Sequence, residues 1–187
     1  MKLLTEEDIP KIIKKDPWMM HVLTIIRQLN LPDWWIGAGF VRGKVWDFLH
    51  DKKERTPLPD IDVIYFDPQE KNPERKEKEL SKYLGKQLPN YHFEVINQAR
   101  THLWHNDPPY RNSSQALSRW VETATCIGVR LNEKDELELT TPLGIDDLVN
   151  LIVRPNPIIP FDKDLFEKRI KEKKWLTLWP KLKVIYS

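Results

Sequence analysis

The stretch that decides the fold is Asp60-Ile61-Asp62-Val63-Ile64-Tyr65-Phe66. Its β-branched and aromatic residues predict a strand. Because side chains alternate between the two faces of a strand, Asp60 and Asp62 point one way while Ile61 and Val63 point into the core. Two carboxylates about 7 Å apart along a strand can converge on a hard divalent cation such as Mg²⁺ or Mn²⁺. The alternative is that Asp60 only ends the preceding loop and Asp62 is solvated at a sheet edge.

A glycine-rich turn precedes this strand in the sequence. Residues 34–36 predict a short buried strand that runs into Gly37-Ala38-Gly39, and a helix is expected from about Phe40 to Leu49 with Arg42 near its start. Glycine lets the backbone approach a ligand closely, and the first turn of a helix offers free N–H groups to phosphate. Glycines equally serve tight packing. A phosphate-binding turn followed by a carboxylate pair, however, supplies both halves of what a metal–triphosphate needs.

The rest of the chain alternates helical and strand patterns. Helices are expected at 16–29, 72–86, 113–120, 145–153 and 165–175, and strands at 92–97, 123–131 and 136–140, the last two as a hairpin. This order predicts an α/β (α+β) fold, in which helices flank a mixed β-sheet. No repeat interrupts the pattern, so we expect one domain over 1–187, with a core at about 17–105 and the C-terminal hairpin and helices at 113–187.

The composition excludes several classes of protein. The formal net charge of +2 gives no global basic field, so a nucleic-acid partner would need a local patch. The single cysteine, Cys126, cannot form an internal disulfide or a thiolate zinc site. Residues 1–15 lack the apolar stretch of a secretion signal, and no apolar run approaches the roughly 20 residues of a membrane span. We therefore expect a cytoplasmic protein with no membrane partner.

These motifs resemble those of a known superfamily. Ile36-Gly37-Ala38-Gly39-Phe40-Val41-Arg42 followed by Asp60-Ile61-Asp62-Val63 is similar to the signature of polymerase-β-type nucleotidyltransferases, closest to the head domains of CCA-adding enzymes and bacterial poly(A) polymerases. Over nearly its full length the chain also resembles an uncharacterised family of bacterial nucleotidyltransferases. The stretches that carry this second resemblance are 33–36, 60–67, 97–100, 119–125, 154–157 and 179–182.

The resemblance implies a fold, an activity and a set of site residues. The fold is that of nucleotidyltransferases, and the activity is transfer of a nucleoside monophosphate from a nucleoside triphosphate to an acceptor hydroxyl. Asp60 and Asp62 would hold Mg²⁺ (or Mn²⁺), with Glu94 as a third carboxylate on a neighbouring strand. Gly37-Ala38-Gly39 and Arg42 would bind the phosphates. The acceptor stays open and is a small molecule, an RNA or a protein.

The strand that carries Glu94 has further polar residues. If its alternation continues, Gln98, Arg100 and His102 share the face of Glu94, with one apolar exception between them. Such a face predicts a wet pocket, in which Arg100 would contact phosphate and His102 would donate to it or move a proton. The alternative is that the strand ends near Asn97 and the rest is a polar loop.

Other polar and aromatic residues have structural explanations. We expect a salt bridge between Glu122 and Arg119 or Arg154, with substrate contact as the alternative. Asp146-Asp147 is expected to cap the helix that begins there. Four tryptophans at element ends are expected to be core anchors, although one of them could stack on a nucleobase: Trp34, Trp35, Trp120 and Trp175.

Two other functions fit the same residues. One is a catalytically idle nucleotide-binding or interaction module of the same fold. It is favoured by Gly37-Ala38, where active members of the superfamily usually have Gly-Gly or Gly-Ser, and by the lack of an evident acceptor-binding domain. The other is a metal-dependent phosphohydrolase that uses the same carboxylates with water as the nucleophile.

Overall fold

A five-stranded mixed sheet forms the centre of the protein. The computed structural model describes residues 4–186, so residues 1–3 and 187 of the expected domain lie outside the described part. The strand order is β3-β2-β1-β4-β5, with β2 and β3 parallel and the other neighbours antiparallel. The strands are β1 Trp35–Gly37, β2 Ile61–Tyr65, β3 Phe93–Asn97, β4 Gly128–Leu131 and β5 Leu137–Thr140. The predicted mixed sheet is confirmed.

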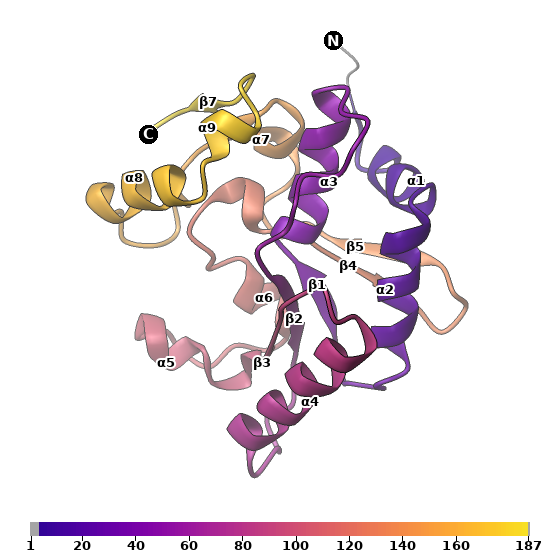
Figure 1. Cartoon of the computed structure of the whole chain (residues 1–187). Coiled ribbons are helices and arrows are strands. Elements are labelled where there is room, and N and C mark those ends of the chain that lie inside the picture. Colours follow the sequence, from indigo (N-terminus) through magenta and orange to yellow (C-terminus); the bar gives the residue numbers. More distant parts are fainter. Residues whose placement is uncertain (1–3, 187) are drawn as a thin grey trace.

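Helices cover the sheet on both sides. In Figure 1, α1 and α2 lie to the right of the sheet, and α5 and α8 lie to its left. Within residues 4–186, no helix is both long and apolar enough to cross a membrane. The α-helices are α1 Asp8–Lys14, α2 Pro17–Arg27, α3 Gly39–Leu49, α4 Pro73–Gln87, α5 His102–His105, α6 Ser113–Leu117, α7 Asp146–Val149, α8 Lys163–Glu172 and α9 Trp175–Leu178.

Local side-chain chemistry explains where several helices begin. The Asp16 carboxylate accepts a hydrogen bond from the Met19 N–H at 3.2 Å, and Pro17 occupies the first turn of α2. Asp162 caps α8 in the same way through the N–H of Leu165, at 3.0 Å. The start of α2 agrees with the sequence prediction. α1 was not predicted; it packs an isoleucine face against the core.

The C-terminal third differs most from the prediction. The expected helix over 145–153 ends at Val149, because Leu151 adopts a left-handed conformation (φ 60°). Residues Ile152–Val153 then form β6, which pairs in parallel with β7, Lys183–Val184. The expected helix over 165–175 is two helices, α8 and α9, because Lys174 also has positive φ (51°). After these bends, Trp175 at the start of α9 packs against Trp46 of α3.

Asp146-Asp147 does not cap α7. The residue at the N-cap is Ile145, and no side chain caps the helix. The Asp147 carboxylate instead accepts hydrogen bonds from the Thr123 hydroxyl (2.6 Å) and from Nε of Arg154 (2.9 Å). It therefore ties α7 to the segments before β4 and after β6.

Candidate active site

A cavity of about 800 Å³ contains most of the residues that the sequence singles out. The turn after β1, the first turn of α3, β2, β3, α5 and the segment from α8 to α9 form its walls. Of the candidate residues, the cavity brings together six: Ala38, Gly39, Arg42, Asp60, Asp62 and Glu94. The C-terminal helices therefore complete a site whose other residues come from the sheet and α3.

The three candidate carboxylates lie on adjacent strands. Asp62 in β2 is the register partner of Glu94 in the parallel strand β3, so their side chains lie on the same face of the sheet. Asp60 lies two residues before Asp62, directly before β2. The alternation of the sequence thus places all three carboxylates along one wall of the cavity.

These carboxylates are less tightly gathered than we expected. In the described part of the chain, no group of three or more His, Cys, Asp or Glu side chains is placed to hold a metal ion. The side chain of Glu94 is 48% exposed, and its Oε1 lies 3.8 Å from Nε2 of His92. The shared face of the three carboxylates agrees with the prediction, and their role as a metal site stays a prediction.

The electrostatics of Asp62 favour a cation at this wall. Burial, together with the nearby carboxylates of Asp60 and Glu94, raises the pKa of Asp62 to about 7. A divalent cation would offset each of these effects, and carboxylate oxygens are the donors that Mg²⁺ and Mn²⁺ prefer. The donor set therefore fits such an ion.

The turn after β1 opens into the same cavity. The carbonyl of Ala38 accepts hydrogen bonds from the N–H groups of Val41 (3.1 Å) and Arg42 (2.8 Å), so α3 begins at this point. A Cβ added to Gly39 would meet no atom closer than 3.7 Å, so space remains beside its backbone. Ala38 itself has φ 41° and ψ −110°, a conformation that favours glycine.

Gly37 has a packing role in the structure. It ends β1 outside the residues that line the cavity. A Cβ on Gly37 would lie 2.9 Å from the Trp120 ring, which is too close for two carbon atoms. Gly37 therefore serves tight packing, which was the alternative role given for these glycines, while Gly39 faces the cavity.

Arg42 is a buried cation that lacks a carboxylate partner among the described residues. It is 7% exposed, and its guanidinium stacks on the rings of Trp175 (4.4 Å) and Trp46 (5.1 Å). Within the described part of the chain, its Nε has no hydrogen-bond partner. Burial lowers the pKa of Arg42 to about 10, a shift that Glu122 and Asp62 oppose. An anion in the cavity would satisfy this guanidinium.

The expectation that β3 extends past Asn97 is wrong. The Asn97 side chain accepts a hydrogen bond from the N–H of Ala99 at 3.1 Å, and this contact starts a 3₁₀ turn at Gln98–Arg100. The strand alternation therefore stops, and His102 begins α5. The alternative interpretation, a strand that ends near Asn97, is the correct one.

As a result, Gln98, Arg100 and His102 do not line the cavity. The amide oxygen of Gln98 accepts a hydrogen bond from the Thr101 hydroxyl at 3.1 Å. Arg100 donates to Glu77 (2.6 Å) and Glu74 (3.1 Å) of α4. Nδ1 of His102 lies 3.1 Å from the carbonyl oxygen of Ala99. Each of the three side chains therefore serves local structure.

The arginine pairs also differ from the prediction. Arg119 pairs with Asp107 (2.7 Å) and Arg154 with Asp147 (2.9 Å). Glu122 pairs instead with Arg169 of α8 (2.7 Å), and Arg169 lines the cavity together with Lys173. No local pattern marks Arg169 in the sequence, where it is one of several cations on an amphipathic helix.

Tryptophans hold other parts of the site. Trp34 and Trp35 are buried as predicted. Trp175 is also buried, but it stacks on Arg42 at the cavity wall, and Trp120 lines the cavity over Gly37.

The sequence profile of a family described as "Nucleotidyltransferase" matches residues 24–184. The chain belongs to this nucleotidyltransferase family. A solved structure described as revealing a CCA-adding enzyme head domain supports this: it is 35% identical, with a TM-score of 0.84, over 98% of this chain and 97% of the other. The nucleotidyltransferase fold is therefore shown, and with it an NTP-using transferase in general terms.

More distant solved structures share the fold of this nucleotidyltransferase. The Thermotoga maritima CCA-adding enzyme complexed with tRNA is 16% identical, with a TM-score of 0.52, over 95% of this chain and 42% of that one. A CCA-adding enzyme in complex with CTP is 14% identical, with a TM-score of 0.52, over 95% of this chain and 43% of that one. The nucleotidyltransferase thus spans less than half of these two enzymes. Among curated proteins, no significant match is found.

Proposed function

We propose that this nucleotidyltransferase transfers a nucleoside monophosphate from a nucleoside triphosphate to an acceptor hydroxyl with Mg²⁺ or Mn²⁺. The acceptor oxygen would bond to the α-phosphorus, the bond from this phosphorus to the β-phosphate oxygen would break, and pyrophosphate would leave. The observation that carries the proposal is the polarity of the cavity. Asp60, Asp62 and Glu94 lie along one wall, and the unpaired guanidinium of Arg42 lies at another. A metal–triphosphate is complementary to both walls, because its metal ion would face the carboxylates and its phosphates would face the guanidinium.

Each residue would have a defined task. Asp60, Asp62 and Glu94 would hold the metal, which when bound neutralises charge on the reacting oxygens. The backbone around Gly39 and the guanidinium of Arg42 would bind the β- and γ-phosphates. Glu94 is the most accessible of the carboxylates and would orient the acceptor hydroxyl and accept its proton. Positioning and charge neutralisation would supply most of the catalysis.

The acceptor is a small molecule, an RNA or a protein. Two CCA-adding enzymes of similar fold have been solved in complex with tRNA and with CTP. Lys173, Lys174 and the exposed Trp104 line the cavity. Lysines and an exposed aromatic ring are groups that bind single-stranded RNA, which favours RNA for the first assays. We treat residues 1–187 as one domain because α8 and α9 line the same cavity as the sheet.

An α-labelled triphosphate tests the proposal. The protein is incubated with each of the four labelled NTPs, Mg²⁺, and RNA or small-molecule acceptors. Label retained on the acceptor supports transfer. Label released only as the free monophosphate or diphosphate, whether or not acceptor is present, favours the phosphohydrolase.

A catalytically idle nucleotide-binding module is the second candidate. One observation favours it: Ala38 holds a backbone conformation that suits glycine, at the turn proposed to bind phosphate. A thermal-shift screen of NTPs with and without Mg²⁺ separates the possibilities, because a ligand that binds the native state raises the melting temperature. Metal-dependent binding without transfer to any acceptor supports the idle module.

A further inference from the structure

Arg169 connects α8 to a buried carboxylate. Its Nε donates to Oε1 of Glu122 at 2.7 Å, and its Nη2 donates to Oε2 at 3.3 Å. Glu122 is 1% exposed, and the hydroxyl of Thr125 donates its hydrogen to the backbone carbonyl of Glu122 at 2.7 Å. Arg169 therefore supplies two charged donors to a buried carboxylate, which would be left unsatisfied if Arg169 moved away.

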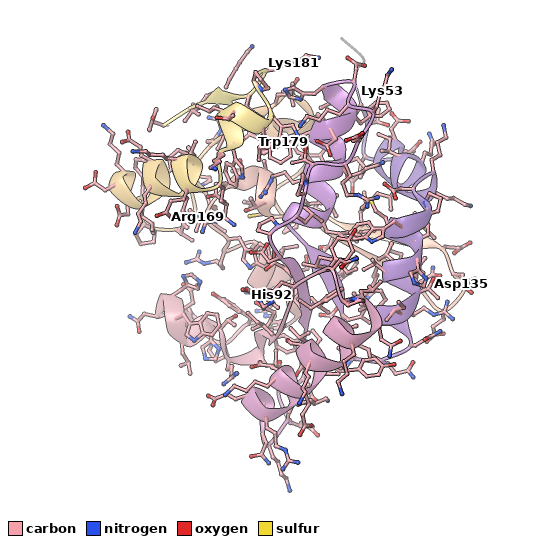
Figure 2. The ribbon with its side chains drawn as sticks, in the orientation of Figure 1. Lys53, His92, Asp135, Arg169, Trp179 and Lys181 are labelled. Atoms are coloured by element: carbon pink, nitrogen blue, oxygen red, sulfur yellow. The ribbon has the colours of Figure 1, made fainter. Side chains whose placement is uncertain are left out.

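The ion pair uses only one edge of the guanidinium. Glu122 takes the edge formed by Nε and Nη2, and no described residue accepts a hydrogen bond from Nη1. The side chain of Arg169, labelled in Figure 2, is 31% exposed. It lines the same cavity as Arg42. One donor group therefore stays available for a ligand while the other edge is fixed.

The orientation of Arg169 depends on Glu122. Within α8 only Phe166 and Ile170 are buried, so apolar packing anchors the helix at two side chains. Glu122 lies 47 residues away in the sequence and belongs to the segment that precedes β4. Their contact fixes the cavity-facing side of α8 relative to the sheet.

Cations and carboxylates face each other in this part of the cavity. Arg42, Arg169 and Lys173 line it together with Asp60, Asp62 and Glu172. Asp60 and Asp62 attract both guanidinium groups. Arg169 is one cause of the lowered pKa of Arg42, so the two guanidinium groups repel each other. A polyanion between them would turn this repulsion into two favourable interactions.

We propose that Arg169 is a second phosphate-binding residue of this cavity and that Glu122 is its positioning residue. The ligand is a polyphosphate. That this polyphosphate is the triphosphate group of a nucleotide rests on the proposed function. Arginine suits this task because its planar fork can bind Glu122 and a phosphate oxygen at once. A lysine ammonium would have to share one nitrogen between them.

Inorganic tripolyphosphate with Mg²⁺ tests the proposal by titration calorimetry. Relative to wild type, Arg169→Ala and Arg169→Lys should each bind it about tenfold or more weakly. The matched control is Lys168→Ala, which removes a cation from the exposed side of the same helix and should stay within about twofold of wild type. If Arg169 had only a structural role, a folded Arg169→Lys variant would bind tripolyphosphate as tightly as wild type.

Loss of Arg169 leaves Glu122 buried without its partner, so Arg169→Ala is also checked for folding by circular dichroism. If it does not fold, the double variant Glu122→Gln with Arg169→Gln replaces the ion pair by two amides that can bind each other. It too should lose at least about tenfold in affinity.

Three results would overturn the inference: no tripolyphosphate binding by wild type, near-wild-type binding by a folded Arg169→Ala or double variant, or full rescue by Arg169→Lys. Wild type that binds tripolyphosphate but transfers no nucleotide would contradict the proposed function and leave this inference standing. Nucleotide transfer by Arg169→Ala, with wild-type affinity for the nucleotide, would contradict this inference and leave the proposed function standing.

Discussion

Replacing Asp62 by asparagine should stabilise the metal-free protein above neutral pH. Asp62 is partly buried, and its charged form is disfavoured by burial and by Asp60 and Glu94, which raise its pKa from 3.8 to about 7. Asparagine keeps the shape of the side chain and removes the charge. The mutation therefore removes an unfavourable interaction from the folded state.

The pKa sets an upper limit on the effect. Since one pKa unit equals about 1.4 kcal/mol, a rise from 3.8 to about 7 corresponds to about 4 kcal/mol. The side chain faces a water-accessible cavity, which screens its charge, so we expect Asp62→Asn to gain about 1–3 kcal/mol at pH 8.

The sign of the pH dependence follows from linkage. Between pH 3.8 and about 7 the folded carboxyl binds a proton more tightly than the unfolded one. Above pH 7 the charged Asp62 therefore lowers the free energy of unfolding by its full amount. As the pH falls toward 4, Asp62 is protonated and wild type regains that free energy. The advantage of Asp62→Asn should be largest at pH 8 and close to zero near pH 4.

Urea unfolding at pH 5 and pH 8 in the presence of EDTA measures this difference. The control variant is Glu133→Gln, an exposed carboxylate in the turn between β4 and β5, which should change stability little at either pH. An advantage of Asp62→Asn that is equal at the two pH values, or a loss of stability at pH 8, would refute the reasoning.

Three further substitutions test other parts of the site. Ala38→Gly should stabilise the protein by about 1 kcal/mol in urea unfolding because φ 41° is unfavourable for alanine; a loss of stability would show that the turn is unstrained. Gly37→Ala should lower stability by about 1–3 kcal/mol, since its Cβ would lie 2.9 Å from the Trp120 ring; an unchanged melting temperature would contradict this packing. Arg42→Ala should weaken binding of an NTP about tenfold or more in calorimetry while the matching nucleoside binds as to wild type, and equal losses for both ligands would exclude a phosphate contact.

The carboxylate wall was predictable because its signal is local. The alternation of Asp60, Ile61, Asp62 and Val63 predicts that both aspartates point the same way. In the structure Asp62 lies in β2, Asp60 lies directly before it, and both line the cavity. The turn before α3 was predictable for the same reason, since glycines before a helix mark the point where the chain changes direction.

Features that depend on distant contacts were not predictable. β3 ends at Asn97, although the polar alternation of the sequence continues. The Asn97 side chain donates to the Asp67 carbonyl and the Glu70 carboxylate, about 30 residues away, and its oxygen accepts from the N–H of Ala99. Nothing near Leu151 marks the left-handed residue that ends α7. Arg169 reaches the site through Glu122, which lies 47 residues away, so only the tertiary structure reveals it.

The central claim is that the carboxylate wall binds a metal–triphosphate, and the double variant Asp60→Asn with Asp62→Asn tests it most directly. Melting temperatures are measured without ligand, with Mg²⁺ alone, with an NTP alone and with both. We predict that Mg²⁺ and NTP together raise the melting temperature of wild type, and that the folded double variant melts no lower than wild type but shows no such rise. A double variant that keeps the full rise, or that melts well below wild type without ligand, would contradict the account.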